Sequence, residues 1–383
     1  MTDPSDTATL ALTPLDALHR RLGAKMVPFA GYAMPLQYPA GILQEHLHTR
    51  AAAGLFDVSH MGQIVLRAPS GRAEDAALAL ETLVPADIVS LPPGRQRYAV
   101  FTDDTGGILD DLMVSNQSDH LVLVVNAARK AADLAHLRER LAGRCAVEPL
   151  ADRALIAVQG PKAEAVLAAL APEAAAMRFM DVRRLTLAGA ACLVSRSGYT
   201  GEDGYEISVP ADRAVALCEA LVADPAVQPV GLGARDSLRL EAGLCLYGSD
   251  LDPGTTPVEG ALEWSIPKAR RTGGVRAGGF PGADVILRQL ADGAARRRVG
   301  LAPEGRAPVR AGAALFGAAD GGEPVGVVTS GGFGPSIGAP VAMGYVPVAA
   351  AAVGTVLFAD VRGKRLPVRV AALPFVPPRY KRS

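Results

Sequence analysis

Two neighbouring acidic residues interrupt an apolar segment of the chain. The stretch "GGILDDLMV" places Asp110 and Asp111 in a run that is otherwise typical of a buried strand. Consecutive side chains of a strand point to opposite faces, so these two carboxylates cannot converge on one point as a catalytic acid pair does. A buried carboxylate needs hydrogen-bond donors nearby, or a ligand that supplies them. Two hypotheses follow: a hairpin whose acids accept hydrogen bonds from backbone amides, or one acid directed into a binding cavity.

The stretch "SGYTGEDGYEISV" contains a further candidate acid. Glu206 alternates with the apolar residues Tyr205 and Ile207, which is typical of a strand with Glu206 on its other face. A carboxylate on such a face can accept from two adjacent N–H donors of a flat heterocycle, or from an arginine in the same bidentate geometry. Ligand binding and a structural Glu–Arg pair are therefore both open. The acids Glu202 and Asp203 lie between glycines and are expected in a hairpin turn.

The stretch "GLGARDSLRLEAGLCLYG" places Arg235 near the start of a predicted helix, after a glycine-rich turn. From that position a guanidinium can reach into a cleft and bind a planar acceptor. The alternative is that Arg235, Arg239 and Glu241 form an exposed face of ion pairs.

Composition and motifs exclude several classes of function. Lys plus Arg and Asp plus Glu both total 39, and a chain without net charge is not typical of a nucleic-acid-binding protein. His46 and His48 diverge on a predicted helix and no HExxH motif occurs, so we predict no metal site. The uncharged segment between Glu323 and Asp360 is broken by proline and glycine, so we expect no membrane span. Four scattered cysteines without CxxC, and an N-terminus without a basic region, predict a cytoplasmic protein.

The elements that must position these residues indicate an α+β fold. Up to about residue 260, helices alternate with largely antiparallel strands, whereas from Val299 onward short strands and Gly/Pro turns predict an all-β barrel. Thr13 and Gly23 are expected to bound the first helix, and Asn126 to cap a long helix over 127–143. We predict a region 13–270 of two packed, discontinuous α+β subdomains and a barrel domain 296–378. The glycine-rich and basic stretch "RRTGGVRAGGFPG", residues 270–282, is expected to be a linker or functional loop. Strands are expected near 64–67, 98–102, 108–115, 121–125, 190–196 and 205–209.

Taken together, these motifs resemble those of a known family. The stretches "GLFDVSHMG", "GGILDDLMV", "GYTGEDGYEISV", "ARDSLRLEAGLCLYGSDLDPGTTPVEGALEW" and "TSGGFGPSIGAPVAMGYV" are similar to the glycine cleavage T-protein family of aminomethyltransferases, and the similarity covers roughly residues 13–380. The resemblance implies a three-domain molecule that binds tetrahydrofolate in a central cavity. It implies transfer of the aminomethyl carbon from the lipoyl arm of the H-protein to tetrahydrofolate, with release of ammonia and formation of 5,10-methylenetetrahydrofolate.

The resemblance also implies roles for individual residues. The family's essential aspartate corresponds to Asp111, and Asp110 does not carry that role. Asp111 is implied to stabilise positive charge, to accept a proton, or both. The residues implied to bind or line the folate cavity are Glu206, Arg235, Tyr380, Tyr98, Met61 and Asn126.

Two other functions remain open for the same scaffold. One is a folate-dependent demethylase acting on a small methylated substrate, and the other is a folate-binding protein without catalysis. The segment "SIPKARRTGGVRAGGF" departs from the basic run that relatives carry after the residue equivalent to Trp264. Its residues Lys268, Arg270 and Arg271 are either contacts for an acidic H-protein or a folate polyglutamate tail, or part of a solvated loop.

Overall fold

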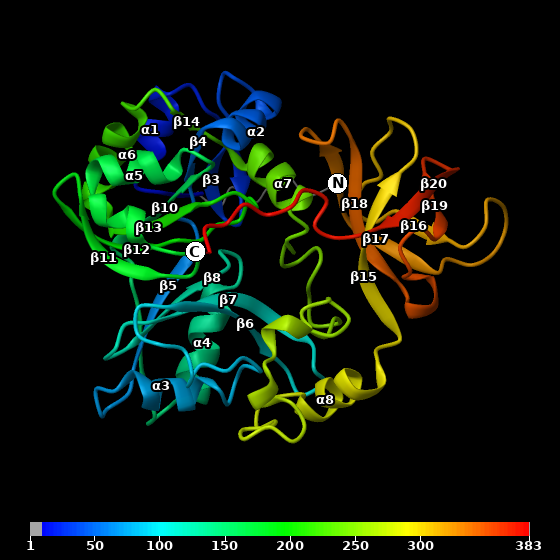
Figure 1. The fold of residues 1–383 in the computed structure, drawn as a ribbon, viewed down its shortest axis with the longest axis horizontal. Coiled ribbons are helices and arrows are strands. Elements are labelled where there is room, and N and C mark those ends of the chain that lie inside the picture. Colours follow the sequence, from blue (N-terminus) through cyan, green and yellow to red (C-terminus); the bar gives the residue numbers. More distant parts are fainter. Residues whose placement is uncertain (1–9, 383) are drawn as a thin grey trace.

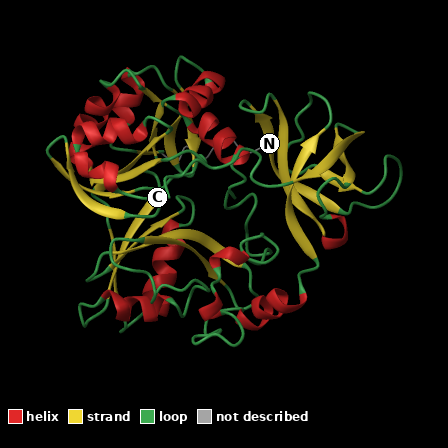
Figure 2. Ribbon diagram, in the orientation of Figure 1, coloured by secondary structure: helices red, strands yellow, loops and turns green. Residues whose placement is uncertain are grey.

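The computed structural model describes residues 10–382, which form two α+β bodies and a β-barrel (Figure 1). The two α+β bodies lie one above the other in this view, and the barrel lies to their right. The chain mixes helices with mainly antiparallel strands and ends in a closed six-stranded barrel, which confirms the predicted α+β class (Figure 2). Within residues 10–382, the longest apolar helices fall short of what a bilayer crossing requires.

The first body is built on a six-stranded sheet whose outer face is covered by helices. In spatial order the strands are β11 (Val182–Leu187), β12 (Ala190–Ser195), β13 (Gly204–Pro210), β10 (Arg153–Gln159), β4 (Ala53–Asp57) and β14 (Val227–Pro229). The covering helices are α1 (Asp16–Arg21), α5 (Ala163–Leu170) and α6 (Ala214–Val222). Leu18, Leu167 and Leu221 from these helices share one core with Ile156 and Ile207 from the strands. Burial of this apolar layer holds the helices against the sheet.

The second body repeats this arrangement with a five-stranded antiparallel sheet. In spatial order the strands are β6 (Gln96–Thr102), β7 (Ile108–Asn116), β8 (Leu121–Val125), β5 (Gly62–Arg67) and β9 (Ala146–Pro149). Helices α3 (Ala73–Leu80) and α4 (Lys130–Arg140) contribute Leu80 and Leu137 to a core with Phe101, Leu112 and Leu123. The predicted strands of this region are all present.

The remaining elements connect the two bodies to the barrel. A small sheet consists of β1 (Ala11–Leu12), β3 (Tyr32–Gln37) and β2 (Lys25–Phe29). Helices α2 (Ile42–Ala51) and α7 (Leu232–Glu241) pack against each other, and α7 also packs against β3 and the barrel. The barrel strands are, in order, β15 (Arg296–Pro303), β18 (Ala339–Pro347), β17 (Gly326–Gly334), β16 (Ala314–Phe316), β19 (Val356–Val361) and β20 (Lys364–Ala371). Short 3-10 turns lie at Pro172–Ala176, Ala211–Arg213, Glu263–Ser265, Lys268–Arg270 and Val348–Ala350.

The inner faces of the two large sheets are turned toward each other. On β13, Ile207 belongs to the outer core whereas Glu206 and Ser208 point inward. On β7, Asp110 shares its face with core residues and is fully buried, whereas Asp111 lies on the opposite face. The predicted separation of these two carboxylates is therefore confirmed. Helix α7 covers part of the inner face of the first sheet, where Leu238 shares a buried cluster with Phe56 and Leu155. Polar side chains collect between the sheets over the part of that face that α7 leaves uncovered.

One sequence-based expectation about helices is wrong and another is met only in part. Helix α4 begins at Lys130, and the Asn126 side chain donates to Asp110 and Asp111 and does not cap the helix. Helix α1 begins at Asp16, later than expected, but the Thr13 hydroxyl still accepts from the backbone N–H of Leu15 at 3.3 Å, as an N-cap does, while it donates to Asp57 at 2.7 Å. The segment 271–282 has no α-helix or strand, as expected of a loop, and helix α8 (Ala283–Asp292), which buries Ile286, follows it directly. Tertiary contacts explain the difference at Asn126, because its partners lie across the fold and not in the adjacent helix turn.

A buried polar network joins the first body to the barrel. The expected exposed ion-pair face on α7 is wrong, because Arg239 is buried and its guanidinium donates to Asp250 at 2.8 Å. Asp250 also accepts hydrogen bonds from the hydroxyls of Thr329 and Ser330 on β17, at 2.5 and 2.8 Å. The ion pair of Arg239 and Asp250 is therefore buried, and both partners make further hydrogen bonds. A buried ion pair is tolerated under these conditions.

We expect Asp250→Ala to lower the free energy of unfolding by about 3–5 kcal/mol, because it leaves the Arg239 charge buried without its partner. Chemical denaturation of the purified variant measures the loss. The matched control is Glu304→Ala, which removes the half-exposed ion pair with Arg369 and should cost less than about 1 kcal/mol. Equal losses in the two variants would contradict a structural role for the buried network.

Candidate active site

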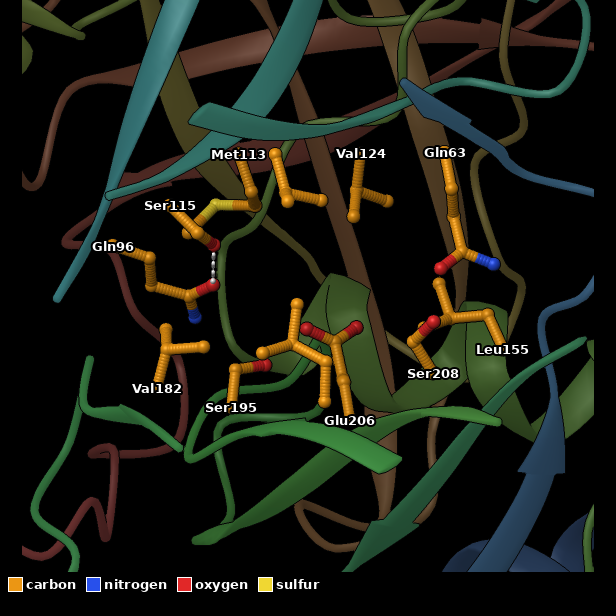
Figure 3. Close-up of a pocket in the computed structure, with 12 residues that line it drawn as sticks. Gln63, Gln96, Met113, Ser115, Val124, Leu155, Val182, Ser195, Glu206 and Ser208 are labelled. Carbon is orange, nitrogen blue, oxygen red and sulfur yellow. Dashed lines mark hydrogen bonds between the residues drawn. The ribbon is translucent and has the colours of Figure 1, made fainter. Parts of the chain in front are cut away.

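A cavity lies between the inner faces of the two sheets. Figure 3 shows Met113 and Ser115 above it and Glu206, Ser195 and Ser208 below it. The upper residues come from β7 and the lower ones from β12 and β13, so the cavity exists only because the two bodies pack together. The volume of the cavity is about 30 Å³, and its apolar walls and converging polar groups suit the polar edge of a ligand.

Glu206 points into this cavity and its carboxylate is only lightly engaged. It accepts a hydrogen bond from the Ser197 hydroxyl at 2.7 Å, and no ion pair involves it among residues 10–382. The Glu–Arg pair that the sequence left open is therefore not formed. Arg235 instead lies over the ring of Tyr199, 4.6 Å from its centroid, and burial lowers the pKa of Arg235 while the charge of Glu206 raises it. Glu206 thus keeps acceptor capacity that a ligand can use.

Asn126 links both acids of the "LDDL" segment. Its side-chain amide donates to Asp110 Oδ1 at 2.9 Å and to Asp111 Oδ1 at 2.7 Å, and its backbone N–H donates to Asp110 Oδ2 at 3.1 Å. Asn126 follows the last residue of β8, which pairs with β7, so the sheet itself places this amide between the two carboxylates. One hypothesis was a hairpin in which backbone amides donate to both acids. It is observed only in part, because a backbone N–H donates to Asp110 whereas Asp111 accepts from the side chain of Asn126.

Asp111 has the strongest signature of a catalytic acid or base in this region. Burial, followed by the negative charge of Asp110, raises the pKa of Asp111 to about 7, against hydrogen bonds from Asn126 and Tyr98. A carboxyl group that ionises near neutral pH can both accept and return a proton at little cost. Tyr98 in turn packs against Trp264, with ring centroids 5.2 Å apart, and Trp264 is 65% exposed. Asp111 is itself half-buried, and Tyr98 lies between it and the exposed ring of Trp264.

The other predicted site residues are distributed unequally. Met61 packs against the apolar cluster that includes Leu155, and Leu155 lines the cavity. Tyr380 does not line this cavity: its ring stacks on Phe179, with centroids 4.1 Å apart, beside a second cavity edged by arginines. Among the predicted site residues, Glu206 lines the first cavity and Tyr380 lies beside the second.

Two charged residues have structural roles that their sequence context did not reveal. Arg270 is buried and donates to the carbonyls of Glu81 and Arg276, so it is not free to contact a partner. Glu202 lies in the connection between the antiparallel strands β12 and β13, as expected, and there it is buried in an ion pair with Arg50, at 2.9 Å.

Two residues of the site were not predicted. Trp264 is the single tryptophan of the chain, and its exposure in the fold is the unusual feature. Asp133 is buried against Asp110, and a signal for it was present in the sequence. It precedes the buried residue Leu137 by four positions, so an acid lies in the apolar stripe of α4.

Comparison with protein families gives matches over nearly the whole chain. The family described as the GCVT N-terminal domain matches residues 15–270, and the glycine cleavage T-protein C-terminal barrel domain matches residues 296–377. An aminomethyltransferase named as mitochondrial from Gallus gallus is 48% identical over 380 residues, covering 97% of this chain and 94% of that protein. One from Dictyostelium discoideum is 44% identical over 395 residues, covering 99% and 95%. The crystal structure of the glycine cleavage system aminomethyltransferase T from Bartonella henselae superposes with a TM-score of 0.90 at 47% identity, covering 98% of this chain and 100% of that one.

The raised pKa of Asp111 makes a prediction about stability. Because its pKa is about 7 in the folded protein and about 4 when unfolded, the folded state binds this proton more tightly. The contribution of Asp111 to stability is therefore complete below about pH 4 and is lost as the pH rises through 7. We expect Asp111→Asn, whose amide oxygen can still accept from Asn126, to lose less stability between pH 5 and pH 8 than the wild type. Denaturation at both pH values measures this, and Asp104→Asn, an exposed acid of the same hairpin, is the control. Parallel losses in wild type and Asp111→Asn would contradict the raised pKa.

Proposed function

The chain belongs to the glycine cleavage T-protein family of aminomethyltransferases, and on that premise we propose that Asp111 promotes transfer of the aminomethyl carbon to tetrahydrofolate. The enzyme is a transferase that uses tetrahydrofolate as co-substrate. The observation that carries the proposal for Asp111 is its position: a carboxyl with a near-neutral pKa, held by Asn126 on the same face of β7 as the cavity residue Met113.

We assign recognition of the folate to the inner faces of the two sheets. Glu206 has free acceptor capacity and points into the cavity, which suits the two adjacent N–H donors of an amino-pyrimidinone edge. Arg235, Tyr98, Met61 and Asn126 are proposed to line the path from this cavity to Asp111. Tyr380 stays a predicted folate contact, which the neighbouring second cavity supports less directly. We further propose that residues 13–270 form the folate-binding region and residues 296–378 the barrel domain.

Asp111 can serve the reaction at two moments. As ammonia leaves the aminomethyl carbon, positive charge develops there, and the Asp111 carboxylate stabilises it in a site largely screened from water. A folate nitrogen then bonds to that carbon, and Asp111 accepts the proton which this nitrogen gives up. One folate nitrogen forms its bond to the carbon as the bond to ammonia breaks, and the second folate nitrogen forms its bond as the carbon–sulfur bond to the lipoyl arm breaks. The two protons that the folate nitrogens lose end on ammonia and on the released thiol, and no covalent bond to the enzyme is required.

We propose that the aminomethyl group arrives on the lipoyl arm of the H-protein. The exposed Trp264, packed on Tyr98, marks a short route from solvent to Asp111 that such an arm can follow. We also propose a cytoplasmic location, because Cys145, Cys192, Cys218 and Cys245 are all unpaired, as expected in a reducing compartment. The names of the relatives refer to mitochondria, so support for the cytoplasm comes from the cysteines and from the N-terminal sequence without a basic region.

The proposal is tested by ammonia release from aminomethyl-loaded H-protein, measured with and without tetrahydrofolate. The wild type should release ammonia rapidly only when tetrahydrofolate is present. We expect Asp111→Asn to lose about 10²–10⁴-fold in turnover, because the amide can neither carry the charge nor accept the proton. Folate affinity, measured by calorimetry, should stay within a few-fold of the wild type.

A variant with normal turnover would remove Asp111 from the mechanism. The same assay distinguishes the two other functions considered for this scaffold. A folate-dependent demethylase would not use the loaded H-protein, and a folate-binding protein without catalysis would release no ammonia above the buffer rate.

We expect Glu206→Ala to weaken tetrahydrofolate binding by about 10–100-fold, the equivalent of losing a hydrogen bond to a charged group. Turnover at saturating folate should fall much less, because Glu206 is assigned to binding. Calorimetry measures the affinity, and Glu148→Ala, which removes an exposed acid of the second body, is the control. Unchanged affinity in Glu206→Ala would return Glu206 to a structural role.

A further inference from the structure

A third carboxyl group lies behind the two acids of β7. Asp133, in the first turn of α4, is 2% exposed, and Asp110 beside it is 0% exposed. The two carboxyl groups are within hydrogen-bonding reach of each other. Two ionised carboxylates in such contact would repel strongly in a buried site, so at least one of them must carry a proton.

The hydrogen bonds of the two groups decide which one holds the proton. Asp110 accepts from the backbone N–H and the side-chain amide of Asn126, at 3.1 and 2.9 Å, which stabilises its ionised form. Asp133 Oδ2 is buried and accepts from no donor in the part of the chain that the structure describes, residues 10–382. An ionised carboxylate without donors is costly, whereas a protonated carboxyl in the same place is itself a donor to Asp110.

The charged groups around the pair act in opposite directions but do not reverse this assignment. Arg129, at the start of α4, favours an ionised Asp133, and its guanidinium lies 5.7 Å from the ring centre of Tyr247. Burial, the hydrogen bond with Asp110 and the charges of Asp110 and Asp111 favour the neutral form. Together, these opposing effects raise the pKa of Asp133 to about 9. Burial also raises the pKa of Asp110.

We propose that Asp133 is held as a neutral carboxylic acid whose O–H donates to Asp110, and that this pair, acting through Asn126, positions Asp111 for carbon transfer. Asp133 is thus a positioning residue, three side chains from the reacting atoms. The positional role rests on the function proposed above for Asp111. The protonation state of Asp133 is independent of that function, because this state depends only on the packing of α4 against β7.

The pair also controls the charge that Asp111 experiences. While Asp133 donates to Asp110, Asp110 stays ionised, and its charge raises the pKa of Asp111. Without that donor, Asp110 lies buried with one partner fewer and takes up the proton itself. The negative charge beside Asp111 then disappears, so the pKa of Asp111 should fall.

The decisive comparison is between Asp133→Ala and Asp133→Asn. The alanine variant removes the donor, so we expect kcat to fall by about 10–100-fold, as when a group that orients a catalytic ligand is lost. KM for tetrahydrofolate should change little, and the pH profile of kcat should shift to lower pH. The asparagine variant retains an N–H donor of the same shape, so it should recover most of kcat and return the pH profile to that of the wild type.

A spectroscopic measurement tests the protonation state without any substrate. At about pH 8, between the pKa of Asp111 near 7 and that of Asp133 near 9, the infrared spectrum of the wild type should contain the carbonyl band of a buried carboxylic acid. This band should be absent in Asp133→Asn and present in Glu139→Ala, which removes an exposed acid from the same helix.

The possible results separate this inference from the proposed function. If Asp111→Asn is inactive but the band is the same in wild type and Asp133→Asn, Asp133 is ionised and the inference is wrong. The inference is also wrong if Asp133→Asn is as impaired as Asp133→Ala. If the band is lost in Asp133→Asn while Asp111→Asn is fully active, the neutral acid stands and only its role in carbon transfer is withdrawn.

Discussion

Accommodating negative charge inside strand β7 is the constraint on which the site depends. Asp110 and Asp111 are adjacent, so the pleat sends Asp110 toward the α4 core and Asp111 to the opposite face of β7, the face from which Met113 lines the cavity. Asn126 donates to both, and one buried carboxylate next to another makes each harder to ionise. Asp111 can therefore be ionised and protonated near neutral pH only because it is buried with Asp110 behind it. The chemistry assigned to this enzyme depends on a charge that lies on the far side of the strand from the cavity.

The layer architecture explains why the cavity lies where it does. Helices α1, α5 and α6 cover the outer face of one sheet, and α3 and α4 cover the outer face of the other. The inner faces consequently face each other, with Glu206 and Ser208 across from Met113 and Ser115 (Figure 3). A site of this kind needs residues from both bodies, and so it forms only when the two bodies pack together. The barrel is held to the first body by the buried contacts of Asp250 with Arg239 and Ser330.

Prediction from the sequence was accurate where local pattern dominates. Period-two alternation correctly placed strands β6, β7, β8 and β13, and it correctly separated Asp110 from Asp111. It was wrong where a polar side chain had a distant partner. Asn126 was expected to cap α4, and Arg239 and Glu241 were expected at the surface, yet each is engaged by residues remote in sequence. Helix propensity and capping rules describe neighbours along the chain and contain no information about such contacts.

Sequence patterns were enough to assign the α+β class, the C-terminal barrel and the family, because hydrophobic period and long motifs are properties of the chain alone. The same patterns singled out Asp111 and Glu206 as acids in unusual surroundings. The three-dimensional arrangement was needed to see that Glu206 has no arginine partner within residues 10–382, that Tyr380 lies beside a separate cavity and that Asp133 meets Asp110. The ionisation of a carboxyl group depends on burial and on charges a few ångströms away in space, and residues brought that close by folding are often far apart in the sequence.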